Sequence, residues 1–187
     1  MFMRKLLLSL TILFCCFLHI AAQEQIEREE YAVYKVLLGD GYQSIVSKFT
    51  VADELKSIFK VRKRELSFVQ SETRKNFNQR NEKSFELQNN FGIKPDVKLV
   101  VDEEVNLYFE MAKENDLAAE NALYEKFGSR SLAYLSRVGF NKTKTQALVS
   151  LTSDSGFCGT CSTNFVFVLS KQTGTWKIEK KVIGWIS

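Results

Sequence analysis

The most regular hydrophobic pattern in the chain lies in its last third, from residue 134 to residue 187. Short runs of apolar and β-branched residues are separated there by turn residues at 141–144, 154–159 and 172–174. This spacing is typical of an antiparallel meander. It predicts four strands, at 133–140, 145–152, 164–171 and from 175 to about 186, the last with a bend near Gly184.

The third predicted strand should lie at the centre of this sheet. Its sequence, NFVFVLS, is apolar at successive positions, so both of its faces should be covered. In the strand before it, Ala147, Val149 and Leu151 share one face. In the strand after it, Trp176 and Ile178 alternate with charged residues, which is typical of a half-exposed strand.

Upstream of the meander, apolar residues recur at helical spacing in four stretches. The predicted helices cover 26–38, 51–69, a stretch that begins at Asp102 as its N-cap, and 117–127 before Gly128. Shorter apolar runs predict strands at 44–50, 83–87 and 97–101, whereas the polar stretch 71–81 is expected to be irregular.

These elements predict an α+β fold. The helices should pack on one face of a mainly antiparallel sheet, which ends in a C-terminal four-stranded meander. No shift in composition and no internal repeat marks a boundary, so residues 23–187 are expected to form a single α+β domain.

The first 22 residues have the composition of a secretory signal peptide. Basic residues stand at positions 4–5, positions 6–20 are apolar, and two alanines at 21–22 provide a cleavage site. The apolar run is shorter than the about 20 residues of a membrane span. We therefore expect cleavage after Ala22, a secreted or periplasmic location, and no stable membrane span after cleavage. A retained N-terminal anchor is the alternative.

Cleavage would change the chemistry that the chain can perform. Removing 22 of 187 residues leaves 165, and it takes away His19, the only histidine. The net charge falls from +4 to +2, because Arg4 and Lys5 are lost and no acid is lost. A chain without imidazole has no Ser–His or Cys–His pair and no histidine metal ligand. We therefore expect no metal site, no cofactor and no catalytic residue.

Basic residues concentrate between Lys56 and Lys83, where nine Lys or Arg and three Glu occur. One interpretation is a surface for an anionic partner, such as an acidic polysaccharide or a membrane. The alternative, which we favour, is a solvated helix face, because the cluster is short and lacks interleaved stacking aromatics. Nucleic acid is not an expected partner.

Three segments of the meander, SRVGF, ALV and GTWKI, follow one another in a distinctive order. The residues concerned are Ser136, Arg137, Val138, Gly139, Phe140, Ala147, Leu148, Val149, Gly174, Trp176 and Ile178. In this order they resemble a family of largely uncharacterised secreted proteins, known chiefly from bacterial genomes. The resemblance implies a shared fold and export, and no activity. Ser150 stands where that family usually has Tyr, and the following loop carries two cysteines where it often has glycine.

Cys158 and Cys161 are the only cysteines outside the predicted signal peptide. Their CxxC spacing suits a dithiol that cycles with a disulfide. However, the residues after them predict a strand, and a redox CxxC needs a helix N-terminus to lower the pKa of its first thiol. We favour the other interpretation, a structural disulfide that tightens the loop between the second and third strands.

Ser136 and Arg137 form a ligand-binding candidate. Gly139, inside a predicted strand, indicates a bulge or a close backbone approach. Arg137 could then present its cation to a ligand carboxylate or phosphate. The alternative is an arginine on the solvent face of a strand. Residues 141–143 also form an N-glycosylation sequon, which matters only in a eukaryote.

Two functions from different classes are compatible with these features. The first is an exported, non-enzymatic binding or interaction domain, whose partner is an unknown protein or a small ligand bound on the open face of the sheet. The second is a thiol-disulfide redox protein that uses Cys158 and Cys161. A third, weaker hypothesis is a hydrolase built on helix carboxylates.

Overall fold

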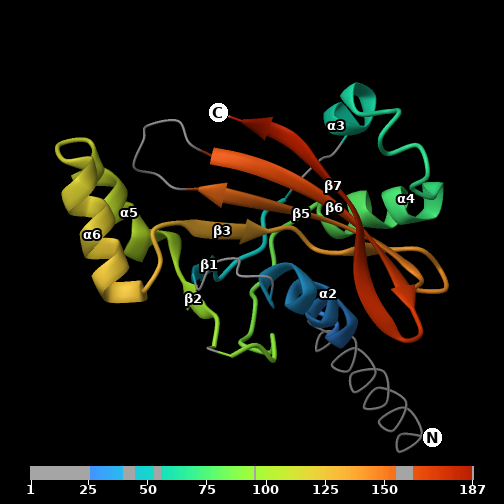
Figure 1. The fold of residues 1–187 in the computed structure, drawn as a ribbon, viewed down its shortest axis with the longest axis horizontal. Coiled ribbons are helices and arrows are strands. Elements are labelled where there is room, and N and C mark those ends of the chain that lie inside the picture. The colour runs from blue at the N-terminus through green and yellow to red at the C-terminus, as the bar shows by residue number, and fades with distance from the viewer. Residues whose placement is uncertain (1–25, 40–44, 53–55, 95, 155–161, 187) are drawn as a thin grey trace, which may run out of the picture.

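One mixed, mainly antiparallel sheet organises the computed structural model of the protein (Figure 1). The structure describes residues 26–39, 45–52, 56–94, 96–154 and 162–186. The strands are β1 (Ile45–Ser47), β2 (Lys98–Val100), β3 (Leu132–Leu135), β4 (Gly139–Phe140), β5 (Gln146–Asp154), β6 (Ser162–Gln172) and β7 (Thr175–Ile186). They run in the order β2-β1-β3-β5-β6-β7, with β4 also paired to β5. The predicted α+β class is confirmed.

The predicted meander forms the larger part of the sheet. Strands β5, β6 and β7 pair antiparallel in sequence order, and β6 lies between the other two, as its apolar sequence predicted. At the other edge, β1 pairs parallel with both β2 and β3. The two parallel pairings at this edge make the sheet mixed.

Helix α2 (Arg28–Gly39) covers one face of the sheet. Its apolar side chains Val33, Tyr34 and Leu37 pack with alternate residues of the strands, including Val149 and Phe167. A strand presents every second residue to the same face. The opposite positions of β5 and β6 therefore need cover from the other side.

The remaining helices provide that cover. Helices α3 (Lys56–Val61) and α4 (Ser71–Arg80) pack on the face that carries Leu148 and Val168. Helices α5 (Asp102–Ala112) and α6 (Asp116–Phe127) pack against Leu132 of β3. The next residue, Ala133, points to the opposite face of the sheet, where it packs with the side chains of α2. Helices thus lie on both faces, not on one as the sequence predicted, because β5 is apolar on both sides.

Helix α4 contradicts the prediction that residues 71–81 are irregular. Its sequence is polar, but Thr73 and Phe77, one turn apart, are both buried. Thr73 Oγ1 donates to Gln146 Oε1 at 3.0 Å, and Phe77 packs with Leu148. The helix is therefore held by contacts with the sheet more than by its own hydrophobic pattern.

The helix predicted over 51–69 is much shorter in the structure. Among the described residues of that range, α3 is the only helical segment, and after Val61 the chain continues in turns that bury Leu66 and Val69. The predicted strand at 83–87 is reduced to a single bridge between Glu86 and Phe49. Both segments lie along the sheet surface, so tertiary contacts decide their shape.

The strand predicted at 133–140 is interrupted. It forms β3 and β4. Between them Ser136 keeps a single bridge to Val51, and Arg137 and Val138 leave the ladder. A Cβ on Gly139 would lie 2.4 Å from the Cβ of Phe77, which confirms the predicted close backbone approach. Because buried backbone groups need hydrogen-bond partners, side chains must satisfy those of the interrupted segment.

The helical hairpin and the last strand agree with the sequence. Gly128 ends α6 in the left-handed conformation, with φ of 76°. Helix α5 begins at Asp102 itself and has Val101 as its N-cap, so the predicted cap position was wrong by one residue. In β7, Asn164 faces Trp185 and Phe165 faces Ile183, so Gly184 is the extra residue of a bulge at the predicted bend. No helix among the described residues is long and apolar enough to cross a membrane.

Candidate functional site

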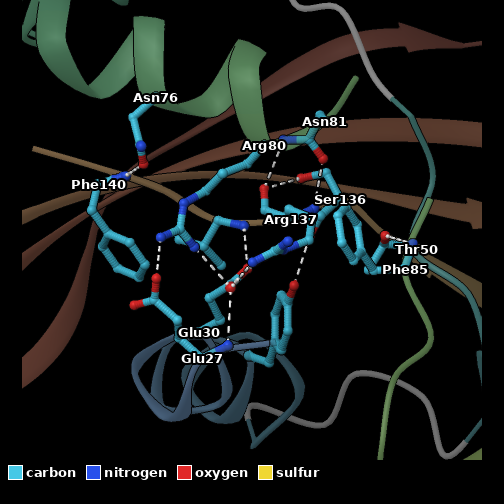
Figure 2. Close-up of polar contacts among 12 residues, drawn as sticks. Glu27, Glu30, Thr50, Asn76, Arg80, Asn81, Phe85, Ser136, Arg137 and Phe140 are labelled. Atoms are coloured by element: carbon cyan, nitrogen blue, oxygen red, sulfur yellow. Dashed lines mark hydrogen bonds and ion pairs between the residues drawn. The ribbon is translucent and has the colours of Figure 1, made fainter. Parts of the chain in front are cut away.

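A buried carboxylate on α2 lies at the centre of the polar contacts in Figure 2. Glu30 is 0% exposed and accepts hydrogen bonds from five described donors. Two of them come from Arg137, with Nη2 at 2.7 Å and Nε at 3.1 Å. The others are Arg80 Nη1 at 2.8 Å and the backbone amides of Val138 at 3.0 Å and Glu27 at 3.1 Å. One carboxylate therefore joins α2, α4 and the interrupted strand.

Arg137 is fixed from several directions. Its side chain is 1% exposed, and its Cζ lies 4.3 Å from the centroid of the Phe85 ring. Asn81 holds its backbone, since Asn81 Oδ1 accepts from Arg137 N at 2.7 Å and Asn81 Nδ2 donates to Arg137 O at 3.0 Å (Figure 2). The side chains of Asn81 and Glu30 thus replace the ladder hydrogen bonds that Arg137 and Val138 lack.

Ser136, just before Arg137, connects the interrupted strand to β5. Its Oγ accepts from Ser150 N at 2.8 Å and donates to Arg137 O at 3.1 Å. Tyr34 of α2 donates its hydroxyl proton to Ser136 O at 2.9 Å. Burial, reinforced by the negative charge of Glu30, raises the pKa of Tyr34 well above its ordinary value, so this donor keeps its proton.

The network reaches the surface through Arg80. Arg80 also contacts Glu27 by its Nη2, and Glu27 binds Lys144 Nζ at 2.7 Å. Burial alone would raise the pKa of Glu27, but hydrogen bonds from Lys144 and Arg80 hold it below its ordinary value. The charges therefore alternate from the buried carboxylate outward.

The structure brings the two predicted ligand-binding residues together, but at a buried position. The guanidinium of Arg137 faces Glu30, so a ligand anion would have to compete with that carboxylate. The prediction of a ligand at Ser136 and Arg137 stays a prediction, while the alternative of a solvent-exposed arginine is wrong. Glu30, Arg80 and Asn81 were missed, although Glu30 stands one turn before Tyr34 on the buried side of α2.

A groove of about 640 Å³ lies beside α2, between the helix and residues 88–91. Its lining side chains are Ile26, Arg28, Glu29, Tyr31, Ala32, Lys35, Gln88, Asn90 and Phe91. Tyr31 and Phe91 pack edge to face with ring centroids 5.3 Å apart, and Tyr31 Oη accepts from Gln88 N at 2.7 Å. These contacts fix the wall of the groove to the helix that Glu30 anchors.

The groove has a positive balance of charge. Glu29, its only acid among the described lining, binds Lys171 Nζ at 2.6 Å and Trp176 Nε1 at 2.7 Å. Burial by itself would raise the pKa of Glu29, but these hydrogen bonds lower it below its ordinary value. Glu29 therefore stays ionised and paired. Arg28 and Lys35 are exposed and have no ion pair within the described part of the chain.

Of the other sequence predictions, the cysteine pair and the signal peptide lie outside the described residues, whereas the glycosylation sequon lies within them. Cys158 and Cys161 lie outside them, as does the predicted signal peptide. Asn141 is 5% exposed, and its Nδ2 donates to Gln70 Oε1 at 3.1 Å and to Thr145 Oγ1 at 2.9 Å. Glycosylation of the sequon would replace one of the two Nδ2 hydrogens and so break one of these hydrogen bonds.

The described residues contain no group of three or more His, Cys, Asp or Glu that could hold a metal ion. For the carboxylate hydrolase hypothesis, a general acid needs a raised pKa. The hypothesis concerned the glutamates of α5 and α6, and it stays a prediction. The pKa values of Glu27 and Glu29, at the start of α2, are lowered, so neither of these is suited to that role.

Comparisons with protein-family models, with curated proteins and with solved structures find no match to this chain. The resemblance to secreted bacterial proteins therefore stays a prediction from the C-terminal motif. Any function proposed for the chain depends on the geometry and charge of its own residues.

Proposed function

We propose that this protein is an exported, non-enzymatic binding domain whose groove beside α2 holds a small organic anion. The observation that carries the proposal is the pair of cations without ion pairs among the described residues, Arg28 and Lys35, at a groove of about 640 Å³. Ligand sites of small molecules commonly have volumes of about 300–1,000 Å³. The groove is therefore large enough for a small organic molecule.

The lining indicates the chemistry of that ligand. Arg28 and Lys35 are separated by seven residues, or about two turns of α2, and both can bind a carboxylate. The edges of Tyr31 and Phe91, with Ala32 and Ile26, provide apolar contact for the rest of the molecule. An aromatic or short aliphatic carboxylate combines both properties.

The buried network supports binding by making the groove rigid. Glu30 fixes the inner side of α2, while Tyr31 and Phe91 fix the facing segment. A wall that is ordered before binding loses less conformational entropy when the ligand arrives. We therefore expect the groove to keep its shape on binding.

Calorimetric titration with benzoate tests the proposal, with benzamide as its neutral isostere. We expect benzoate to bind and benzamide to bind about fivefold more weakly, since an ion pair at an exposed site contributes up to about 1 kcal/mol. Arg28→Ala and Lys35→Ala should each weaken benzoate binding.

Lys142→Ala is the matched control, because Lys142 is exposed, lies outside the groove and carries the same charge. Equal weakening by Lys142→Ala would indicate a general effect of net charge and contradict the assignment. Equal affinity for benzoate and benzamide would contradict the role of the cations.

The redox alternative depends on Cys158 and Cys161, which lie outside the described residues. Thiol titration followed by a measured reduction potential separates the two interpretations. A disulfide with a potential below about −300 mV is structural, whereas a higher potential would support redox activity.

A further inference from the structure

The hairpin of α5 and α6 presents an apolar stripe to solvent. Leu107 and Met111, one turn apart on α5, are 68% and 46% exposed, and Leu117 and Tyr124 on α6 are 65% and 51% exposed. Single exposed apolar residues are ordinary, but four large ones exposed on one helical hairpin are typical of an interaction site. The inner sides of the same two helices are buried through Val105, Ala112, Ala119 and Leu123.

The same hairpin is strongly acidic. From residue 102 to residue 127 the sequence contains eight Asp or Glu and two Lys, a net charge of −6. Ion pairs within the described chain use Glu110, with Lys113, and Glu120, with Arg130. Glu103, Glu114 and Glu125 are exposed and take part in none of these pairs.

The opposite charge lies on α3, α4 and the turns between them. Residues 56–83 contain nine Lys or Arg and three Glu, a net charge of +6. Lys60, Lys63, Arg64 and Lys75 are exposed and have no ion pair among the described residues. This surface also has exposed apolar residues, Val61 and Phe68. In Figure 1, α3 and α4 lie at one end of the molecule and the hairpin at the other.

We propose that the acidic hairpin of one copy docks on the basic α3–α4 surface of a second copy, in a head-to-tail contact. The opposite signs of charge on the two surfaces, each with exposed apolar residues, argue for this occupant. Complementary potentials steer two surfaces together and set their register. Because the two surfaces differ, the contact is heterologous and gives a ring or an open chain of subunits.

The contact should be weak. Helices of 11 and 12 residues span about 17–18 Å, so the hairpin face is smaller than the about 800 Å² that each partner buries in a standard interface. We expect self-association in the micromolar range, and we expect it to depend on salt. The Debye length falls from about 10 Å at 0.1 M salt to about 3 Å at 1 M, which removes the electrostatic attraction.

Sedimentation velocity of the chain from Gln23 onward, which contains every described element, measures this association. One variant carries Glu103→Lys and Glu114→Lys on the hairpin. A second variant carries Lys63→Glu and Arg64→Glu on the basic surface. Each variant alone should associate at least about tenfold more weakly at low salt, and an equimolar mixture of the two should associate again.

Two controls separate this contact from other effects. Asp96→Lys with Glu179→Lys makes the same change in net charge as the hairpin variant, at exposed positions off both surfaces, and it should not weaken association. Leu107→Ser with Leu117→Ser changes no charge, and it should weaken association.

A wild-type chain that stays monomeric at low salt would overturn the proposal, and so would a mixture of the charge variants that fails to associate. Because the groove beside α2 contributes to neither surface, benzoate binding and self-association can fail independently. Circular dichroism of each variant verifies that the fold is intact.

Discussion

Glu30→Gln removes one charge from the buried network and preserves the size of the side chain. Arg137 then stays buried without its full countercharge, and an amide group replaces one acceptor oxygen that faces N–H donors at 2.7–3.1 Å. Breaking a buried ion pair by removing one partner costs about 3–5 kcal/mol. For a chain of this size, 1 kcal/mol shifts the melting temperature by about 2–4 °C, so Tm should fall by about 6–20 °C.

Thermal and urea unfolding followed by circular dichroism measure this loss. Glu29→Gln is the matched control, because Glu29 is the preceding residue of the same helix and also has hydrogen-bonded partners. Its side chain is 26% exposed, so the loss there should be about 1 kcal/mol or less. If Glu30→Gln costs no more than Glu29→Gln, Glu30 does not hold α2, α4 and the interrupted strand together.

The remaining predictions concern acid stability and one hairpin turn. Because the pKa of Glu29 is lower in the folded state, its stabilising contribution is present above the unfolded value near 4.5 and is lost as pH falls below it. Glu29→Gln should therefore flatten the fall in unfolding free energy between about pH 5 and pH 3, and an unchanged slope would contradict the shift. Thr173 and Gly174 both have positive φ, of 49° and 83°, in the turn between β6 and β7. Such a turn prefers the sequence Asn-Gly, so Thr173→Asn should raise the unfolding free energy by about 1 kcal/mol. A lower Tm would refute this. Thr175→Asn, in β7, should give no such gain.

The sequence was most informative where periodicity alone decides the structure. Strands β5, β6 and β7 alternate or are apolar on both faces, and the hairpin of α5 and α6 has helical spacing with Gly128 at its end. Even the irregularity at Gly184 was predicted, as a bend, and it is a bulge in the structure. In each case the signal is contained within a few neighbouring residues.

The sequence was least informative where distant residues decide the structure. Helix α4 has only two buried residues, Thr73 and Phe77, and they are held by the sheet. Glu30 stands in the acidic first turn of a helix, a position that is typical of solvated residues. Its partner Arg137 is 107 positions away, so no local pattern could connect them.

The candidate site was predicted in part. Ser136 and Arg137 were selected because Gly139 indicated an unusual strand, and the strand is indeed interrupted there. The groove beside α2 was not foreseen, because it forms between a helix and a loop about 60 residues later. Its two cations are separated by other residue types in the sequence and form no motif.

A nitrogen–proton NMR titration of the chain from Gln23 onward with benzoate tests the proposed anion site most directly. We expect the amide resonances of residues 26–35 and 88–91 to shift together and to saturate, with benzamide producing little change. Shifts confined to the hairpin or to β7, or identical shifts with both compounds, would contradict an anion site in the groove beside α2.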